Sequence, residues 1–177
     1  MADRGLTGIL LVGGASSRFG SPKALARFGG STLAERAWAV LGEACDERIA
    51  VGKAADGLRL PFPLLDDASD VRAPLAGIVA GLRAARHDVC VVLPVDCPLV
   101  TGEALRALGE AVAVPQTGPL PGAYERALLP ELEARLSSGD LGLRGINPRV
   151  LELDERLLAN VNTPAELAAL AASATRS

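Results

Sequence analysis

The residues of this chain that could do chemistry begin near its start, in the stretch GILLVGGASSRFGSPKAL, residues 8–25. An apolar run ends there in two glycines, and Arg18, Gly20 and Lys23 follow shortly after. Glycines let a backbone approach a phosphate and turn its N–H groups toward it. A forked guanidinium and an ammonium are the donors expected around a polyphosphate. The spacing therefore indicates either a phosphate-binding loop or a strand-to-helix loop whose basic residues are solvated.

Two common phosphate-binding motifs do not match this loop. The dinucleotide fingerprint needs GxGxxG, which GGASSRFG does not contain. The P-loop needs GxxxxGK[ST], but Gly14 and Gly20 are one residue too far apart and Lys23 does not follow the glycine. Ala24 also stands where the P-loop has a hydroxyl residue. A phosphate-binding role would therefore belong to another class of loop.

The elements around this loop predict where it lies. Short apolar runs bounded by turn residues predict buried strands at 8–12, 48–52, 62–67 and 89–96, with a further strand at 111–116 and a loop at 118–122. Helical periodicity and capping signals predict helices at 31–44, 75–86, 102–112 and 128–139, and a last one from Pro164. This alternation predicts an α/β fold of three layers, α/β/α, with a mainly parallel, mixed sheet. Ligands bind outside the carboxyl ends of such strands, so the loops after 8–12 and 89–96 are the candidate site.

Composition excludes several classes of function. A length of 177 residues predicts a single domain over 1–177, and a net charge of −3 gives no general attraction to nucleic acid. The cysteines Cys45, Cys90 and Cys97 are odd in number and lack CxxC spacing, so we expect no disulfide framework or zinc site. No signal peptide or membrane-spanning run is visible, and we expect a cytoplasmic protein without membrane contact. Nearly all basic residues are arginine, and the two lysines are Lys23 and Lys53.

Four stretches together resemble the molybdenum cofactor guanylyltransferase (MobA) family. LLVGGASSRFGSPKAL is similar to that family's signature loop, usually written LAGGxSxRMGxDKAL. DDASDVRAPLAGI resembles its acidic loop, LPVDCPLV its aspartate loop, and NVNTPAEL its carboxyl-terminal turn. The four stretches occur in family order between residues 8 and 167. The resemblance implies a Rossmann-like nucleotidyltransferase fold.

The resemblance also implies a reaction, in which GMP passes from GTP to the terminal phosphate of molybdenum-molybdopterin and pyrophosphate is released. The second pKa of a phosphate monoester is about 6, so this nucleophile is largely ionised at neutral pH and needs no general base. Catalysis would then rest on positioning and charge neutralisation, with Mg²⁺ as cofactor. The partners implied are GTP, the pterin substrate, and transient contacts with cofactor-delivery and molybdoenzyme-chaperone proteins.

Individual residues take roles from the same resemblance. Arg18 and Lys23 would hold the β- and γ-phosphates and the departing pyrophosphate. Asp96 would bind Mg²⁺ together with waters and phosphate oxygens, the alternative being an ordinary turn aspartate. The residues implied to lie along the nucleotide are Leu11, Val12, Gly13, Gly14, Gly20, Lys23, Asp66, Pro74, Leu75 and Asp96.

The implied pterin side involves three further residues. Asn162 is a candidate second metal ligand or ribose contact, by likeness to the wider nucleotidyltransferase fold. Its alternative role is to cap the last helix together with Thr163. Asn160 and Tyr124 would lie on the pterin side or behind the residues that touch the pterin.

The chain departs from the family pattern at four places. Val12 replaces an alanine, Pro22 an aspartate and Ala73 a glycine, and VGKAAD lacks an asparagine that the family often has near guanine. The last departure leaves the choice of base open. The alternatives are a cytidylyltransferase for the same cofactor, a sugar-phosphate nucleotidyltransferase, and a non-catalytic nucleotide-binding module. PLAGI argues against the first, the short chain against the second, and the retained Arg18, Lys23 and Asp96 against the third.

Overall fold

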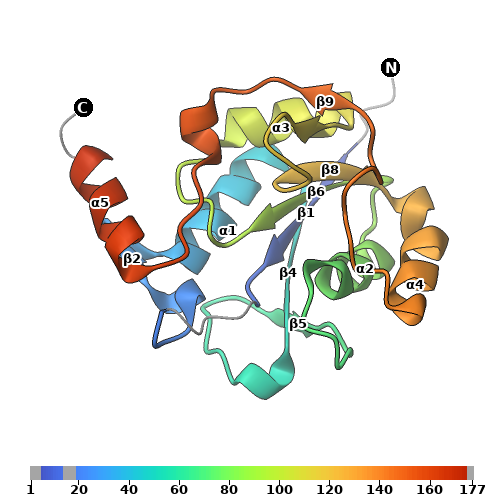
Figure 1. Cartoon of the computed structure of the whole chain (residues 1–177), viewed down its shortest axis with the longest axis horizontal. Coiled ribbons are helices and arrows are strands. Elements are labelled where there is room, and N and C mark those ends of the chain that lie inside the picture. The colour runs from blue at the N-terminus through green and yellow to red at the C-terminus, as the bar shows by residue number, and fades with distance from the viewer. Residues whose placement is uncertain (1–4, 14–18, 175–177) are drawn as a thin grey trace.

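Five strands form the central sheet of the computed structural model, which describes residues 5–13 and 19–174 (Figure 1). The strands lie in the order β5 (Leu64–Asp66), β4 (Glu47–Gly52), β1 (Leu6–Leu11), β6 (Val89–Pro94) and β8 (Gly122–Glu125). The first four run parallel, and β8 pairs antiparallel with β6. The predicted mainly parallel, mixed sheet is therefore confirmed.

β1 can lie at the centre of the sheet because its residues tolerate burial. Four are leucine or isoleucine, one is glycine, and the Thr7 hydroxyl donates a hydrogen bond to Glu47. All six residues of β1 are buried, as expected for a strand covered on both faces. The register places Leu11 opposite Val51 of β4 and Pro94 of β6. The three strands β1, β4 and β6 therefore end at the same edge of the sheet, and the residues that follow each strand meet there.

Helices cover both faces of this sheet and complete the three layers. On one face α1 (Leu33–Ala44) packs beside α3 (Gly102–Ala111), and α5 (Pro164–Ala174) joins the same apolar core through Leu167. On the other face α2 (Pro74–Ala84) packs beside α4 (Leu129–Ser138). β1 contributes to both cores, with Leu10 on the α1 side and Ile9 on the α2 side, because alternate strand residues point to opposite faces.

The predicted start signals of two helices are confirmed. The Thr32 hydroxyl accepts a hydrogen bond from the Glu35 amide at 3.1 Å, and the Glu35 carboxylate accepts one from the Thr32 amide at 2.8 Å. This capping box opens α1. α2 begins at Pro74, where the missing N–H costs nothing.

The region 111–125 differs from the sequence prediction. Only Val114–Pro115 of the predicted strand 111–116 is extended (β7), and it pairs with β9 (Val150–Leu151) in a separate sheet. The edge strand of the central sheet is instead β8, which begins at the end of the predicted loop. β8 has few apolar residues and no regular period, and its place depends on Tyr124, which is buried in the core.

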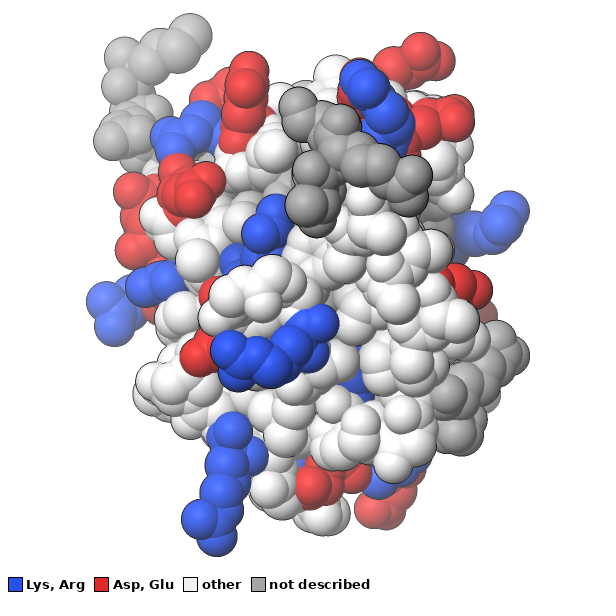
Figure 2. Space-filling view, turned by 90° about the vertical axis from the view of Figure 1, so that its left-hand side faces the viewer, with Lys and Arg blue, Asp and Glu red and all other residues white. Residues whose placement is uncertain are grey.

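The remaining elements are short. They are the hairpin β2 (Arg27–Phe28) and β3 (Ser31–Thr32), and the 3₁₀ turns η1 (Lys23–Leu25), η2 (Ala54–Asp56), η3 (Arg126–Leu128) and η4 (Glu155–Leu158). Of the helices that the structure describes, none combines the length and apolar character needed to cross a membrane. Acidic and basic side chains are interspersed on the face drawn in Figure 2, so no broad basic patch gathers among the described residues of that face.

Candidate active site

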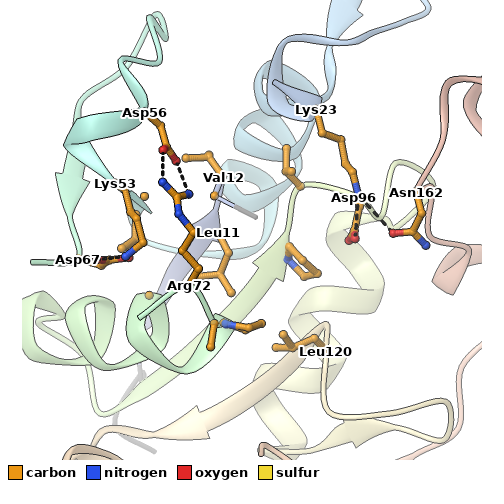
Figure 3. A pocket seen from close by; sticks show the side chains of 18 residues that line it. Leu11, Val12, Lys23, Lys53, Asp56, Asp67, Arg72, Asp96, Leu120 and Asn162 are labelled. Carbon is orange, nitrogen blue, oxygen red and sulfur yellow. Dashed lines mark hydrogen bonds and ion pairs between the residues drawn. The ribbon is translucent and has the colours of Figure 1, made fainter. Parts of the chain in front are cut away.

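A pocket of about 320 Å³ opens at the edge where β1, β4 and β6 end (Figure 3). Two backbone hydrogen bonds hold the strand ends together beyond the regular ladder. The Val12 amide donates to the Val51 carbonyl and the Val95 amide donates to the Leu11 carbonyl, both at 3.0 Å. The residues that line the pocket are Leu11, Val12, Gly13, Lys23, Val51, Gly52, Lys53, Asp56, Asp67, Arg72, Ala73, Pro74, Gly77, Pro94, Val95, Asp96, Leu120 and Asn162.

At one end of the pocket, Lys23 lies between two oxygen-bearing side chains. Its Nζ atom lies 3.3 Å from Oδ1 of Asn162, to which it donates a hydrogen bond, and 3.7 Å from Oδ2 of Asp96. The three residues come from η1, from the turn after β6 and from the segment before α5. We call this group the Lys23 cluster. Its members are far apart in the chain, and only the fold brings them together.

Hydrogen bonds position two members of the Lys23 cluster, Asp96 and Asn162. The Val161 amide donates to the Asp96 carbonyl at 2.9 Å, which places Asn162 beside Asp96. The buried Cys97 thiol donates to Oδ1 of Asp96 at 3.6 Å, while Oδ2 faces Lys23. Burial and the neighbouring Asp96 charge raise the pKa of Cys97, so this thiol stays protonated and remains a donor.

Lys23 sits on η1, which Ala24 anchors in the core. The turn before it needs a glycine, because Gly20 has a φ of 67°, a conformation that other residues adopt only under strain. The Lys23 ammonium also lies 5.6 Å from the centre of the Phe19 ring. This part of the opening motif is therefore built to hold one cation at the edge of the pocket.

The chemistry of the Lys23 cluster suits a magnesium ion. A carboxylate oxygen of Asp96 and an amide oxygen of Asn162 both face one cationic group, the Lys23 ammonium. Oxygen ligands of this kind suit Mg²⁺, which is usually held by one or two carboxylates together with waters and substrate phosphates. Among the described residues no group of three or more His, Cys, Asp or Glu side chains could hold a metal by itself. Waters or phosphate oxygens would therefore supply the rest of any metal coordination here.

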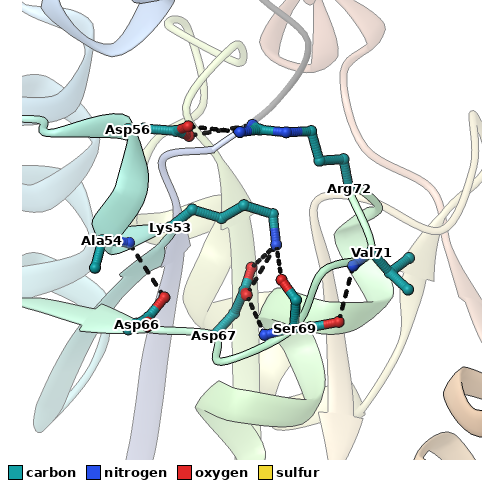
Figure 4. Close-up of polar contacts among 8 residues, drawn as sticks. All are labelled: Lys53, Ala54, Asp56, Asp66, Asp67, Ser69, Val71 and Arg72. Atoms are coloured by element: carbon teal, nitrogen blue, oxygen red, sulfur yellow. Dashed lines mark hydrogen bonds and ion pairs between the residues drawn. The ribbon is translucent and has the colours of Figure 1, made fainter.

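A second ion pair closes the opposite end of the pocket (Figure 4). The Lys53 Nζ donates to both carboxylate oxygens of Asp67, at 2.9 and 3.1 Å, and to the Ser69 carbonyl at 2.5 Å. Both acceptors belong to the loop before α2, so the ammonium is held by this loop. The Lys53 and Asp67 side chains are only 12% and 7% exposed. This pair ties the chain after β4 to the loop that leads into α2.

Arg72 and Asp56 join the same two segments nearer the surface. Nη2 of Arg72 donates to Oδ1 of Asp56 at 2.7 Å, and Nη1 donates to Oδ2 at 3.3 Å. The hydrogen bonds and charge of Arg72 hold the pKa of Asp56 below its usual value, and Asp56 raises the pKa of Arg72. Figure 3 shows this pair and Lys53 across the pocket from the Lys23 cluster.

Apolar residues form the walls between the two ends. They come from the ends of β1 and β4 and from the first turn of α2. Gly77 lets α2 lie against β1, because a Cβ atom at this position would come within 2.7 Å of Leu11 Cδ2. The space between these walls suits a flat ring better than a charged group.

Seven of the residues implied by the sequence line this pocket: Leu11, Val12, Gly13, Lys23, Pro74, Asp96 and Asn162. Gly14 and Arg18 lie outside the described residues. Gly20 and Asn160 are exposed and do not line it.

Asp66, Leu75 and Tyr124 also lie away from the pocket lining. The Asp66 carboxylate accepts a hydrogen bond from the Ala54 amide, and the next residue, Asp67, lines the pocket instead. Leu75 is fully buried on the core side of α2. Tyr124 is buried in β8, where its hydroxyl donates to the Pro119 carbonyl at 2.6 Å.

Lys53, Asp56, Asp67 and Arg72 are pocket residues to which the sequence assigns no role. One signal pointed to Lys53: the chain has only two lysines among its 18 basic residues, and both line this pocket. Arg72 lies within the family-like stretch DDASDVRAPLAGI, although no role was assigned to it there, and no pattern in the sequence distinguishes Asp56 from other exposed charges.

Comparison with known proteins shows which family the chain resembles in sequence and structure. Residues 8–170 match the family model of the MobA-like NTP transferase domain. A protein of Deinococcus radiodurans named probable molybdenum cofactor guanylyltransferase is 34% identical, over 93% of this chain and 93% of its own. One of the same name from Pelotomaculum thermopropionicum is 33% identical, over 91% of this chain and 89% of its own. The crystal structure of molybdopterin-guanine dinucleotide biosynthesis protein A from Archaeoglobus fulgidus is similar with a TM-score of 0.78 and 25% identity, covering 97% of this chain and 100% of that one.

Proposed function

The chain belongs to the MobA-like NTP transferase family, and from that premise we propose that it transfers GMP from GTP to molybdenum-molybdopterin. The terminal phosphate of the pterin would be the acceptor, and the products would be pyrophosphate and the guanine dinucleotide form of the cofactor. The observation that carries the proposal is the convergence of Lys23, Asp96 and Asn162 at one end of the pocket.

In this reaction an oxygen of the pterin phosphate attacks the α-phosphorus of GTP. The bond from that phosphorus to the oxygen bridging to the β-phosphate breaks, and the pyrophosphate leaves with its electron pair. The attacking phosphate has a second pKa of about 6, so it is mostly ionised at neutral pH. Of the described residues that line the pocket, none is a histidine or cysteine that would act as a base or nucleophile. The pocket would therefore act by positioning the two phosphates and neutralising their charge.

The Lys23 cluster is the proposed site of charge neutralisation. Mg²⁺ held by Asp96 and Asn162 would offset the negative charge of the phosphates. Lys23 would exchange Asp96 for an oxygen of the leaving pyrophosphate, since an ammonium is a mobile point charge. Arg18, which the structure does not describe, is proposed to bind the same phosphates.

The rest of the nucleotide would extend along the strand ends. The base would lie between the Leu11–Gly13 segment and the start of α2 at Pro74, at the end of the pocket away from Lys23. The pterin phosphate would approach from the side of Asn162, which belongs to the Lys23 cluster, and of Leu120, which also lines the pocket.

The proposal has three wider parts. We propose that residues 1–177 act as a single nucleotidyltransferase domain, since the family model spans 8–170. We also propose that the reaction takes place in the cytoplasm. Transient contacts would be made there with the proteins that deliver the pterin and receive the finished cofactor.

The direct test is a transfer assay with purified protein, Mg²⁺, molybdenum-molybdopterin and GTP labelled at the α-phosphate. We expect label in the pterin dinucleotide and one pyrophosphate released per transfer, both lost in Asp96→Ala. CTP, ATP and UTP should be poorer donors. A clear preference for CTP would favour the cytidylyltransferase alternative. Nucleotide binding without transfer, unchanged by Asp96→Ala, would favour a non-catalytic module.

A further inference from the structure

The Asp56–Arg72 ion pair spans the pocket at the end where the proposed function puts the base. Asp56 lies in η2, just after β4, and Arg72 lies in the loop before α2. Both residues line the pocket, and Figure 3 shows them on the far side from Lys23. Their position raises the question of whether either charge is available to a ligand.

The hydrogen bonds already made leave one edge of the Arg72 guanidinium unused. A guanidinium has five N–H donors in a planar fork. Asp56 takes one from Nη1 and one from Nη2, which is the end-on edge. No described residue accepts from Nε, so the side edge, formed by Nε–H and an Nη–H, keeps two parallel donors. The Arg72 side chain is 54% exposed, so a ligand can reach that edge.

The other cation at this end has no such capacity. The Lys53 ammonium is hydrogen-bonded to Asp67 and Ser69, and the side chain is only 12% exposed. Lys53 therefore holds the loop in place rather than facing a ligand. Arg72 is the cation of this end whose donors remain available.

Two parallel donors recognise two acceptors side by side. Guanine presents such a pair in O6 and N7, whereas adenine presents an acceptor beside an amino donor. Cytosine presents an amino donor at the equivalent edge, and O4 of a uracil-type ring is a single acceptor. A side-on arginine therefore favours guanine over the other three bases.

We propose that Arg72, held end-on by Asp56, selects guanine by donating from its side edge to O6 and N7. This inference rests on the proposed function, because it assumes that the nucleotide lies with its phosphates at Lys23. It gives the base choice to a residue of the stretch DDASDVRAPLAGI to which the family resemblance assigned no role. The carboxylate of Asp56 would act as a positioning group that fixes the plane of the guanidinium.

The test combines substitutions of Arg72 with analogues of GTP. Binding of GTP, 7-deaza-GTP, ATP and CTP in the presence of Mg²⁺ is measured by calorimetry for the wild type, Arg72→Ala and Arg72→Lys. The matched control is Arg59→Ala, an exposed arginine of the neighbouring segment that does not line the pocket. Thermal unfolding of each variant shows that it is folded.

In the wild type we expect 7-deaza-GTP, which lacks the N7 acceptor, to bind roughly tenfold more weakly than GTP. Arg72→Ala should bind GTP on the order of tenfold to a hundredfold more weakly and no longer distinguish it from 7-deaza-GTP. Arg72→Lys should keep the charge but not restore the preference, because an ammonium is not a fork. Arg59→Ala should behave as the wild type.

The other outcomes overturn the inference in distinguishable ways. If Arg72→Ala weakens GTP, 7-deaza-GTP and ATP by one common factor, the arginine binds phosphate and the proposed function stands. If Arg72→Ala keeps the wild-type preference, Arg72 does not read the base and the proposed function again stands. If the wild type binds no nucleotide, or prefers CTP, the proposed function fails and the inference fails with it.

Discussion

The two ends of the pocket each hold one of the two lysines in the chain, and they hold them differently. Lys53 makes three short hydrogen bonds to a single nearby loop, and its pair with Asp67 is almost buried. Lys23 lies 3.3 and 3.7 Å from oxygens supplied by two distant segments, and Asp96 is 24% exposed. The two lysines are similarly buried, at 15% and 12% exposed, but Asp96 is more exposed than Asp67 and its contact with lysine is longer. The Lys53 pair therefore suits a fixed pocket wall, and the Lys23 cluster suits the proposed exchange of partners when phosphate binds. The same residue type thus lies in a structural ion pair at one end and, under the proposed function, in the phosphate-binding cluster at the other.

Replacing Lys23 should have the largest effect, and on activity alone. We expect Lys23→Met to lower the transfer rate by about a thousandfold, since it removes the ammonium proposed to neutralise the leaving pyrophosphate. Its free energy of unfolding should change by less than about 1 kcal/mol, because water can reach Asp96. Transfer assays and urea unfolding on the same preparation measure both. A large loss of stability would contradict the contrast between the two ends.

Replacing Lys53 should do the reverse. Lys53→Met leaves the Asp67 carboxylate almost buried without its cation, and we expect a loss of about 3 kcal/mol in the free energy of unfolding. Adding Asp67→Asn should restore part of that loss, since the buried charge is removed. Urea unfolding of the single and double variants measures the difference. A single variant as stable as the wild type would show that the Lys53 pair is not a structural element.

Cys97 offers a smaller and more local test of the Lys23 cluster. We expect Cys97→Ala to reduce transfer roughly tenfold, because Asp96 loses a hydrogen bond that orients its carboxylate. Cys97→Ser keeps a donor and should recover most of the rate. The concentration of Mg²⁺ needed for half-maximal activity should rise in the alanine variant and return toward normal in the serine variant. Loss of rate without a change in this concentration would argue that Cys97 only fills space.

The smallest effect concerns pH and the Asp56–Arg72 pair. The pKa of Asp56 is lowered from its ordinary value of 3.8 by the hydrogen bonds and charge of Arg72. A carboxylate whose pKa is lowered on folding stabilises the protein above its unfolded pKa, and this contribution is lost as pH falls through the folded pKa. The free energy of unfolding of Asp56→Asn should therefore be slightly lower than that of the wild type at neutral pH. Below about pH 4 it should fall less steeply with decreasing pH than that of the wild type. Unfolding measured across that range, with Asp70→Asn as an exposed carboxylate control, would show it.

Much of the fold follows from patterns within short stretches. The apolar runs at 8–12 and 89–96 predicted the two central strands, and the Thr32–Glu35 capping box predicted the start of α1. β8 was missed because its few residues carry no period and become a strand only by pairing with β6. Of the predicted strand 111–116, only β7 forms, because β8 and not this segment pairs with β6 at the edge of the central sheet.

The sequence by itself determined the α/β alternation and the identities of Lys23, Asp96 and Asn162, because each depends on local pattern or motif. The tertiary structure decided that these three side chains meet, since strand register and the Val161–Asp96 hydrogen bond bring their segments to one edge. It also decided that Asp67 rather than Asp66 lines the pocket, and that Arg72 donates to Asp56 from Nη1 and Nη2 and not from Nε. Both outcomes depend on the paths of the segment after β4 and the loop before α2, whose sequences have no hydrophobic periodicity. The contacts that fix such paths lie between segments distant in the chain, and no local pattern of residues encodes them.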